Sequence, residues 1–268
     1  MRKSGILAHP TSFPSKYGIG DLGKGAYEFV DFLEKSGQKL WQILPLGQTS
    51  FGDSPYQSFS AFAGNIYIIS PDIFVKKGYL SKKDIEVVPE FDEKNVEYGK
   101  VINYKMSLFR KAFKNFKEDK KYLGFCEKNA FWLDDYSLFM SLKNYFIEQR
   151  KNTYESAEYK AYYSANEKKV KLNAIKDCFY GGAWNSFPDD IRDKKPKAVE
   201  KYTKLLKTEI DFYKFLQYEF FTQWQELKEY ANEKEIEIIG DIPIFVAEDS
   251  ADVWSNRNLF SLDTKGFP

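Results

Sequence analysis

Five carboxylates stand in segments that follow predicted strands, where a parallel sheet could gather them: Asp53, Asp241, Glu248, Asp249 and Asp252. Two such groups can act together as nucleophile and acid/base, which is the arrangement that glycoside chemistry requires. For each carboxylate taken singly, a helix cap or a turn is the ordinary alternative. Asp241 differs because it directly follows the apolar run 238–240 at a predicted strand end, where a charge is costly unless it binds something. We therefore interpret Asp241 as a ligand-binding residue.

His9 is the single histidine of the chain. One histidine cannot form a two-histidine metal site or an H-E-x-x-H zinc helix, so we expect no metal. A Ser-His-Asp triad would have to use His9, and no G-x-S-x-G turn accompanies it. Two interpretations of His9 stay open: a hydrogen bond near the end of the first strand, or a contact to a sugar hydroxyl.

Two patterns typical of phosphate-binding loops begin at Gly18. Gly18, Gly20 and Gly23 match G-x-G-x-x-G, but residues 14–17 precede them instead of a strand, so the turn cannot aim its N–H groups at a pyrophosphate. A P-loop needs Ser or Thr after Lys24, and Gly25 stands there. We expect no nucleotide cofactor.

The elements that must position these residues alternate between strand and helix. Apolar runs predict strands at 5–8, 39–44 and 236–240, and helical spacing predicts helices over 26–33 and 213–231. Gly37 is placed to end the first helix. A strand, a helix and a second strand in this order indicate a parallel sheet of the α/β class.

Residues 76–207 differ in composition from the rest of the chain, because they contain many Lys, Glu and Tyr residues. Their apolar residues have helical spacing at 101–116 and 132–140. We interpret them as a helical insertion between two α/β segments, 1–75 and 208–268. The last part of the chain, 248–268, is predicted to be a polar loop.

The charge balance gives no global field, because 40 Lys and Arg face 39 Asp and Glu. It therefore indicates neither nucleic acid nor an anionic membrane as a partner. The sequence contains no apolar run of about 20 residues and no signal peptide before Pro10. Its two cysteines fit a reducing compartment, so a cytoplasmic location is expected.

Several segments resemble the amylomaltase family, also called disproportionating enzymes or glycoside hydrolase family 77. In chain order they are YGIGDLG at 17–23, WQILPLG at 41–47, GDSPYQS at 52–58, AFAGN at 61–65, WLDDY at 132–136, GDIPIFV at 240–246 and DSADVW at 249–254. Three positions depart from the family's usual pattern: Phe13 replaces Leu, Phe187 replaces Trp, and Glu235 replaces Gly. These departures bear on local packing and leave the matched segments intact.

The resemblance implies a (β/α)8 TIM barrel with helical insertions, of which only the N-terminal part is present in this chain. It implies a 4-α-glucanotransferase that works without a cofactor on α-1,4-glucans and maltooligosaccharides, by a retaining double displacement. By position, Tyr56 matches a tyrosine that packs on the donor-side sugar, and Ser54 matches a neighbour that contacts the glucan. Asp241 matches an aspartate that binds sugar hydroxyls. Trp254 is expected to contribute to the wall of the site.

The same resemblance places the nucleophilic aspartate and the acid/base glutamate on the fourth and fifth strands, beyond Pro268. The family's Arg-x-Asp-His and Glu-Asp-Leu-Gly motifs have no match here. We therefore expect this chain to lack the catalytic carboxylates, with a non-catalytic glucan-binding fragment as the alternative function. An α-amylase-type hydrolase is disfavoured by the loop 53–57 and by the large helical insertion.

Overall fold

The computed structural model describes residues 2–49, 54–155 and 182–268, with only the backbone of 150–155. The chain divides into two compact units, which are described separately. The first unit contains Met1–Ala130 and Lys214–Val246, and the second contains Phe131–Tyr213 and Ala247–Pro268. The segment boundaries at 75 and 207 that the sequence suggests remain a prediction.

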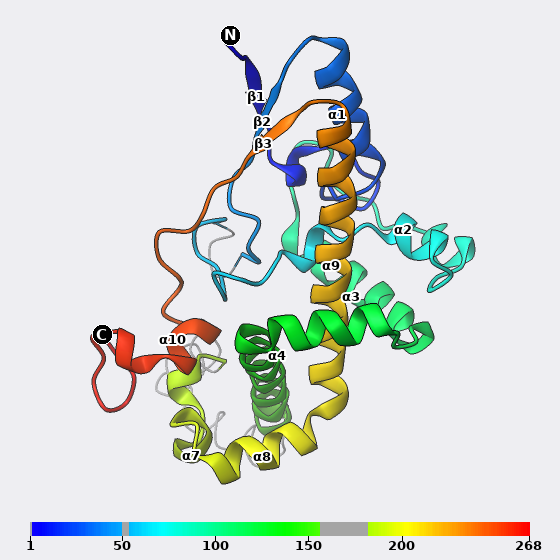
Figure 1. The fold of residues 1–268 in the computed structure, drawn as a ribbon. Helices are drawn as coiled ribbons and strands as arrows, with labels where there is room; N and C mark the ends of the chain where they lie inside the picture. Colours follow the sequence, from blue (N-terminus) through cyan, green and yellow to red (C-terminus); the bar gives the residue numbers. More distant parts are fainter. Residues whose placement is uncertain (1, 50–53, 156–181) are drawn as a thin grey trace. The chain divides into compact units, whose positions relative to one another are not determined.

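The first unit is built on a small parallel sheet, as the sequence predicts. Strands β1 (Gly5–Leu7), β2 (Leu40–Gln42) and β3 (Glu237–Ile239) lie in the order β1-β2-β3 (Figure 1). Ile6 pairs with Trp41, and Trp41 pairs with Ile238. Because side chains alternate along a strand, these three central residues share one face of the sheet.

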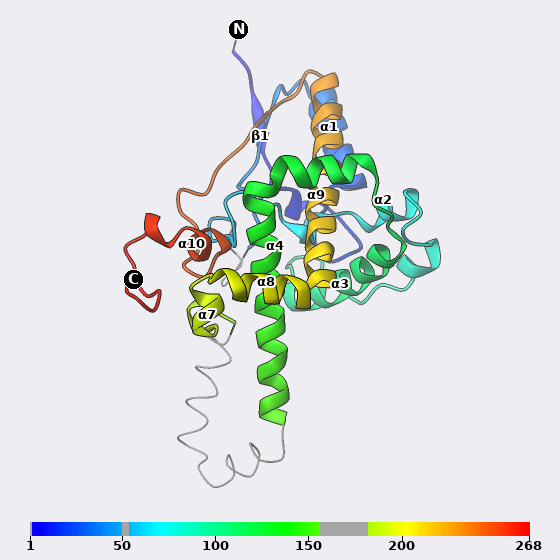
Figure 2. The same ribbon diagram turned by 60° about the horizontal axis from the view of Figure 1, so that its bottom comes forward.

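That face is covered by two helices, α1 (Lys24–Lys35) and the C-terminal part of α9 (Lys207–Glu233). Trp41 is fully buried, 5.5 Å from the ring of Phe29 in α1 and 6.3 Å from the ring of Trp224 in α9. The two helices lie side by side in both views (Figures 1 and 2). Between them the Tyr230 hydroxyl donates to Asp31 at 2.6 Å.

The opposite face of the sheet is open, with Leu7 55% and Ile239 42% exposed. Sheets made only of parallel strands are normally covered on both faces. Among the described residues, this face of the sheet therefore leaves the apolar side chains of Leu7 and Ile239 partly exposed.

The remaining elements of the first unit are mainly helical. They are η1 (Pro10–Ser12), η2 (Ile66–Ile68), α2 (Pro71–Lys76), η3 (Lys82–Ile85), α3 (Tyr98–Asn115) and the beginning of α4 (Lys120–Glu155). The helix predicted over 101–116 is confirmed as α3, and the helical spacing at 132–140 falls within α4. Phe74 of α2 packs edge-on against Phe109 of α3, with ring centroids 5.6 Å apart.

The second unit contains the later part of α4, the start of α9 and several short helices. The short elements are η4 (Trp184–Ser186), α7 (Asp189–Arg192), α8 (Pro196–Leu205), α10 (Ala251–Ser255) and η5 (Arg257–Leu259). The prediction of a loop over 248–268 missed α10, whose first turn is capped by Ser250 Oγ accepting from Val253 N at 3.2 Å. Within the described ranges, no helix is long and apolar enough to cross a membrane.

Candidate functional site

The loop that follows β2 leaves the strand and returns to the same place. Isolated antiparallel bridges join Gly47 to Gly64 and Thr49 to Ser58. Asn65 N donates to Leu46 O at 2.7 Å and closes the base. The loop is therefore a folded projection anchored beside the carboxyl end of β2. Asp53, one of the five candidate carboxylates, lies outside the described residues.

A tight turn near the tip of this loop presents Tyr56. Gln57 N donates to Ser54 O at 3.0 Å, which closes a four-residue turn with Pro55 at its second position, where the fixed φ of proline is favoured. The Ser54 hydroxyl accepts from Tyr56 N at 3.3 Å. Ser54 therefore helps to hold the backbone of Tyr56, whose side chain is 38% exposed.

Asp241 lies two residues after β3, where the sequence places it. The Tyr56 hydroxyl donates to Asp241 Oδ2 at 2.8 Å, and Asp241 Oδ1 accepts from Ile242 N at 2.8 Å. The hydrogen bond to Asp241, with smaller contributions from desolvation and from the negative charge, raises the pKa of Tyr56. The structure thus brings together three of the four predicted residues: Ser54, Tyr56 and Asp241.

This pair offers what a neutral polyol needs. A carboxylate has about four lone-pair positions, and among the described residues two donors, the Tyr56 hydroxyl and Ile242 N, occupy positions on Asp241. The partly exposed ring of Tyr56 can pack against an apolar C–H face while its polar end stays fixed. Shortly after Asp241 in the chain, the apolar side chains of Ile242 and Ile244 are 77% and 90% exposed. The hydroxyl groups of a polyol ligand would donate hydrogen bonds to the Asp241 carboxylate. Its C–H groups would pack against the Tyr56 ring.

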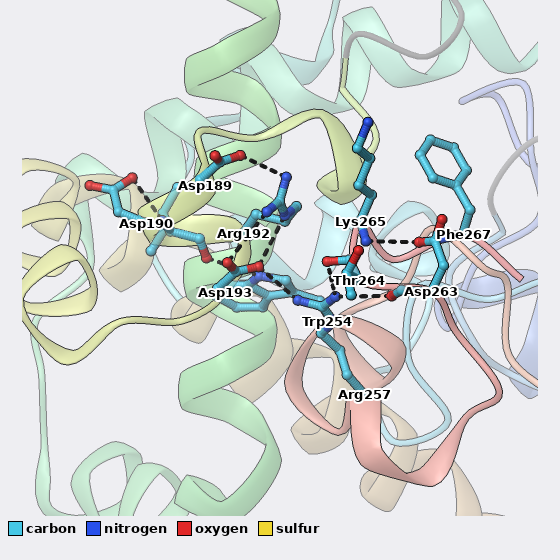
Figure 3. Close-up of polar contacts among 11 residues, drawn as sticks. Asp189, Asp190, Arg192, Asp193, Trp254, Arg257, Asp263, Thr264, Lys265 and Phe267 are labelled. Carbon is cyan, nitrogen blue, oxygen red and sulfur yellow. Dashed lines mark hydrogen bonds and ion pairs between the residues drawn. The ribbon is translucent and has the colours of Figure 1, made fainter.

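Trp254, the fourth predicted residue, is a core residue of the second unit and is 1% exposed. Its Nε1 donates to Ile191 O at 3.2 Å, and its ring lies 5.9 Å from Phe139 and 5.0 Å from Lys194 Nζ. Figure 3 shows Trp254 among the polar contacts of α7 and of the chain after α10. A direct sugar contact would require the ring to be uncovered, and its part in the wall of a site remains a prediction.

The carboxylates near the end of the chain have local partners in the same unit. Asp249 Oδ1 accepts from Trp184 N at 3.1 Å, and Asp249 pairs with Lys143. The main-chain oxygen of Glu248 accepts from Trp184 Nε1 at 2.8 Å. Asp252 lies in the first turn of α10. Asp252 fits the cap and turn interpretation, whereas the Asp249 carboxylate is held by Trp184 and Lys143.

His9 follows β1, and its Nδ1 is buried without a hydrogen-bond partner among the described residues. The hydrogen bond that we expected near this strand end is therefore missing at Nδ1. Burial lowers the pKa of His9 to about 4, so the imidazole is neutral at physiological pH. In the described ranges, no group of three His, Cys, Asp or Glu side chains is arranged to hold a metal ion.

The glycines of the phosphate-like pattern pack the loop after β1. A Cβ on Gly20 would lie 2.0 Å from Pro10 O, so this position requires glycine for close approach. A cavity of about 1320 Å³ lies nearby, between this loop, α1 and α2. None of the four predicted site residues lines it, so the cavity does not coincide with the Tyr56–Asp241 pair.

Two buried glutamines of α9 were missed in the sequence. Gln217 and Gln223 are both 0% exposed and bond to the backbone of the segment that follows the loop. The available signal was their position: both fall on the apolar stripe of the helix predicted over 213–231. A polar residue at a core position of a helix must find a buried partner.

Comparison with known proteins agrees with this architecture. A family model described as 4-alpha-glucanotransferase matches residues 8–268. A 4-alpha-glucanotransferase of Clostridium butyricum is 50% identical over 258 residues, covering 95% of this chain and 46% of the relative. One from Synechocystis is 40% identical over 268 residues, covering 98% of this chain and 46% of the relative.

Solved structures of amylomaltases also match this chain. The amylomaltase from Streptococcus agalactiae in complex with acarbose matches with a TM-score of 0.83 at 37% identity, covering all of this chain and 48% of that one. The amylomaltase from Corynebacterium glutamicum, at 17% identity and a TM-score of 0.63, supports the fold alone.

The parallel strands, their covering helices and these matches define part of a (β/α) barrel, and the predicted fold class is confirmed. The chain belongs to the 4-alpha-glucanotransferase family, as its sequence motifs indicated. It spans about half the length of the curated relatives it matches.

Proposed function

We propose that the complete protein is a 4-α-glucanotransferase that moves segments of α-1,4-glucan to another glucan or to glucose. The observation that carries the proposal is the hydrogen bond of 2.8 Å between Tyr56 and Asp241 at the carboxyl ends of the strands. Barrel enzymes place their sites at this end of the sheet. The relatives carry the same activity in their names.

In this proposal the chain supplies sugar-positioning groups. Asp241 accepts hydrogen bonds from sugar hydroxyls, and the Tyr56 ring packs on the donor-side sugar while its hydroxyl holds the carboxylate in place. Ser54 holds the turn that carries Tyr56, and its contact with the same glucan is proposed from the family resemblance. Maltooligosaccharides are the proposed ligands, and a contribution of Trp254 to the wall of the site is proposed from the family resemblance alone.

Bond cleavage is assigned to other residues. A retaining transfer needs a nucleophilic carboxylate that forms a glycosyl-enzyme intermediate, and an acid/base that protonates the leaving oxygen and then activates the incoming hydroxyl. We propose that an aspartate and a glutamate in a part of the protein beyond this chain fill these roles. Transfer rather than hydrolysis requires a site that excludes water and favours a sugar hydroxyl as the acceptor.

The test is incubation of the complete protein with maltotriose. Transfer gives glucose together with maltooligosaccharides longer than maltotriose, whereas hydrolysis gives only glucose and maltose. Detection of the longer products by chromatography supports the proposal. Purely hydrolytic products, or no products from folded protein, overturn it.

A second candidate is glucan binding without catalysis, which the location of both Tyr56 and Asp241 in this chain favours. Titration of residues 1–268 with maltoheptaose by calorimetry tests it directly, with thermal unfolding as evidence that the sample is folded. Binding that Asp241→Asn weakens would support this candidate. A flat titration on folded protein would exclude it. Location in the cytoplasm, and the absence of nucleic acid or membrane partners, remain predictions from composition.

A further inference from the structure

Gln217 in α9 bonds to both main-chain groups of one residue. Gly64 N donates to Gln217 Oε1 at 2.8 Å, and Gln217 Nε2 donates to Gly64 O at 3.0 Å. The glutamine is fully buried. A buried amide that lost these partners would carry the full cost of desolvation, so the paired arrangement strongly specifies where Gly64 lies.

Gly64 is the residue that closes the loop carrying Tyr56. It bridges to Gly47, and the next residue, Asn65, bonds to Leu46 O at 2.7 Å. On its other side Gly64 lies against α9 so closely that a Cβ would come within 2.0 Å of the Phe220 ring. The base of the loop is therefore held by α9 through both a hydrogen-bonded amide and direct packing.

The same helix also leads into the strand that carries Asp241. After α9 ends at Glu233, Ile236 N donates back to Ala231 O at 2.9 Å, and Glu237 N donates to Lys39 O at 2.9 Å. The chain then enters β3, and Asp241 follows two residues after the strand. One helix thus connects to both partners of the Tyr56–Asp241 pair, by a side-chain bond on one side and by chain continuity on the other.

We propose that Gln217 is a positioning residue that sets the separation of Tyr56 and Asp241. It touches neither side chain, and it acts by fixing the base of the loop to the helix that precedes β3. Where a maltooligosaccharide is the ligand, this inference rests on the proposed function, because the geometry of the pair would then determine sugar affinity.

The test compares Gln217→Met with Gln223→Met. Methionine keeps the length and volume of glutamine and removes its hydrogen bonds. Gln223 is the matched control, because it lies in the same helix, is equally buried and accepts from a main-chain N–H, that of Ser70 at 2.8 Å, outside the loop. Gln217→Met removes two main-chain hydrogen bonds and Gln223→Met removes one, so a larger loss of thermal stability is expected in Gln217→Met whether or not Gln217 positions Tyr56, and stability alone does not test the inference.

Maltotriose affinity and the Tyr56 pKa distinguish the two variants. Both are measured on the complete protein, well below its unfolding temperature. We expect Gln217→Met to weaken maltotriose binding about tenfold or more, which is the effect of one lost charge-assisted contact, and Gln223→Met to change it less than about twofold. We also expect the Tyr56 pKa, followed by the ring-carbon NMR signal, to fall toward its ordinary value only in the Gln217 variant.

Unchanged Tyr56 pKa and affinity in Gln217→Met, or equal losses in both variants, would overturn the inference. If Gln217→Met does not fold, Gln217→Glu measured above the pKa of the introduced carboxyl provides the comparison, because the ionised carboxylate keeps an acceptor for Gly64 N and has no donor for Gly64 O. If the unsubstituted protein binds no maltotriose, the proposed function fails, while the Tyr56 titration still decides the role of Gln217.

Discussion

The hydroxyl of Tyr56 donates to the carboxylate of Asp241 at 2.8 Å, joining residues that are 185 positions apart in the chain. Tyr56 is carried by the loop after β2, and Asp241 by the end of β3. Because β2 and β3 are parallel neighbours, their carboxyl ends lie at the same edge of the sheet. The contact therefore follows from the order of the strands. Tyr56 and Asp241 can each be substituted separately to test it.

Asp241 disfavours the ionisation of Tyr56 mainly through their hydrogen bond, and its negative charge makes a smaller contribution. Its hydrogen bond and its charge both disfavour the phenolate and raise the pKa of Tyr56. In Asp241→Asn the charge is lost and the hydrogen bond weakens because its acceptor becomes a neutral amide oxygen, so the Tyr56 pKa should fall part of the way toward its ordinary value. NMR titration of ring-labelled tyrosine measures this, with Tyr56→Phe assigning the signal. A Tyr56 pKa that stays high in Asp241→Asn would show that the contact is not made in solution.

Glu235 holds an unfavourable backbone conformation at the end of α9, with φ of 59°. Side chains with a Cβ are strained in this region, and glycine is not. Glu235→Gly should therefore raise the midpoint of thermal unfolding by a few degrees, even though it removes an exposed ion pair with Lys39. Lys39→Met, which removes only the ion pair, is the control. A lower midpoint in Glu235→Gly than in Lys39→Met would contradict this account.

His9 should make the protein less stable in mild acid. The folded chain keeps His9 neutral down to about pH 4, whereas the unfolded chain titrates near 6.5. Between these values the unfolded chain binds more protons, so the stability contributed by His9 decreases as the pH falls from 6.5 to 4, by at most about 3.4 kcal/mol. Urea unfolding across this range should show a smaller decrease in His9→Gln than in the unsubstituted protein. Equal slopes would indicate that His9 titrates normally in the folded state.

Lys105 and Asp21 form a buried charged pair in the first unit. Lys105 Nζ donates to Tyr67 O at 2.7 Å and to Ile69 O at 3.1 Å, and it lies 3.8 Å from Asp21 Oδ2. Burial lowers the pKa of Lys105 to about 8 and raises that of Asp21, with the mutual attraction opposing both shifts. Lys105→Met leaves the Asp21 carboxylate buried without its cation and should cost about 3–5 kcal/mol of unfolding free energy.

Adding Asp21→Asn to Lys105→Met removes the uncompensated charge and should recover part of that loss. Urea unfolding of the two single variants and the double variant measures the coupling. A double variant less stable than Lys105→Met alone would mean that the two charges do not compensate each other.

Much of the first unit could be predicted because its signals are local. The apolar runs and the helical spacing around Phe29 and Trp224 require only neighbouring residues, and the place of Asp241 follows from the end of an apolar run. The bond between Tyr56 and Asp241 could only be expected from the resemblance, because a contact across 185 residues leaves no periodic pattern. The backbone partners of Gln217 depend on tertiary packing in the same way.

The role of Trp254 could not be predicted from the sequence. An aromatic residue near a predicted site could either stack on a sugar or fill a core, and the sequence alone does not separate these roles. Its burial depends on Phe139 and Ile191, which are more than 60 residues away in the chain. The short helix α10 was also missed, because a single turn capped by Ser250 has too few residues to show helical spacing.

The central claim is that Tyr56 and Asp241 bind saccharide as one unit. A double-mutant cycle on maltotriose affinity tests it most directly, with Tyr56→Phe, Asp241→Asn and the double variant of the complete protein. We predict that Asp241→Asn weakens binding about tenfold or more and that adding Tyr56→Phe weakens it little further, because the hydroxyl acts through the carboxylate. Strictly additive losses, or unchanged affinity in Asp241→Asn, would contradict the account.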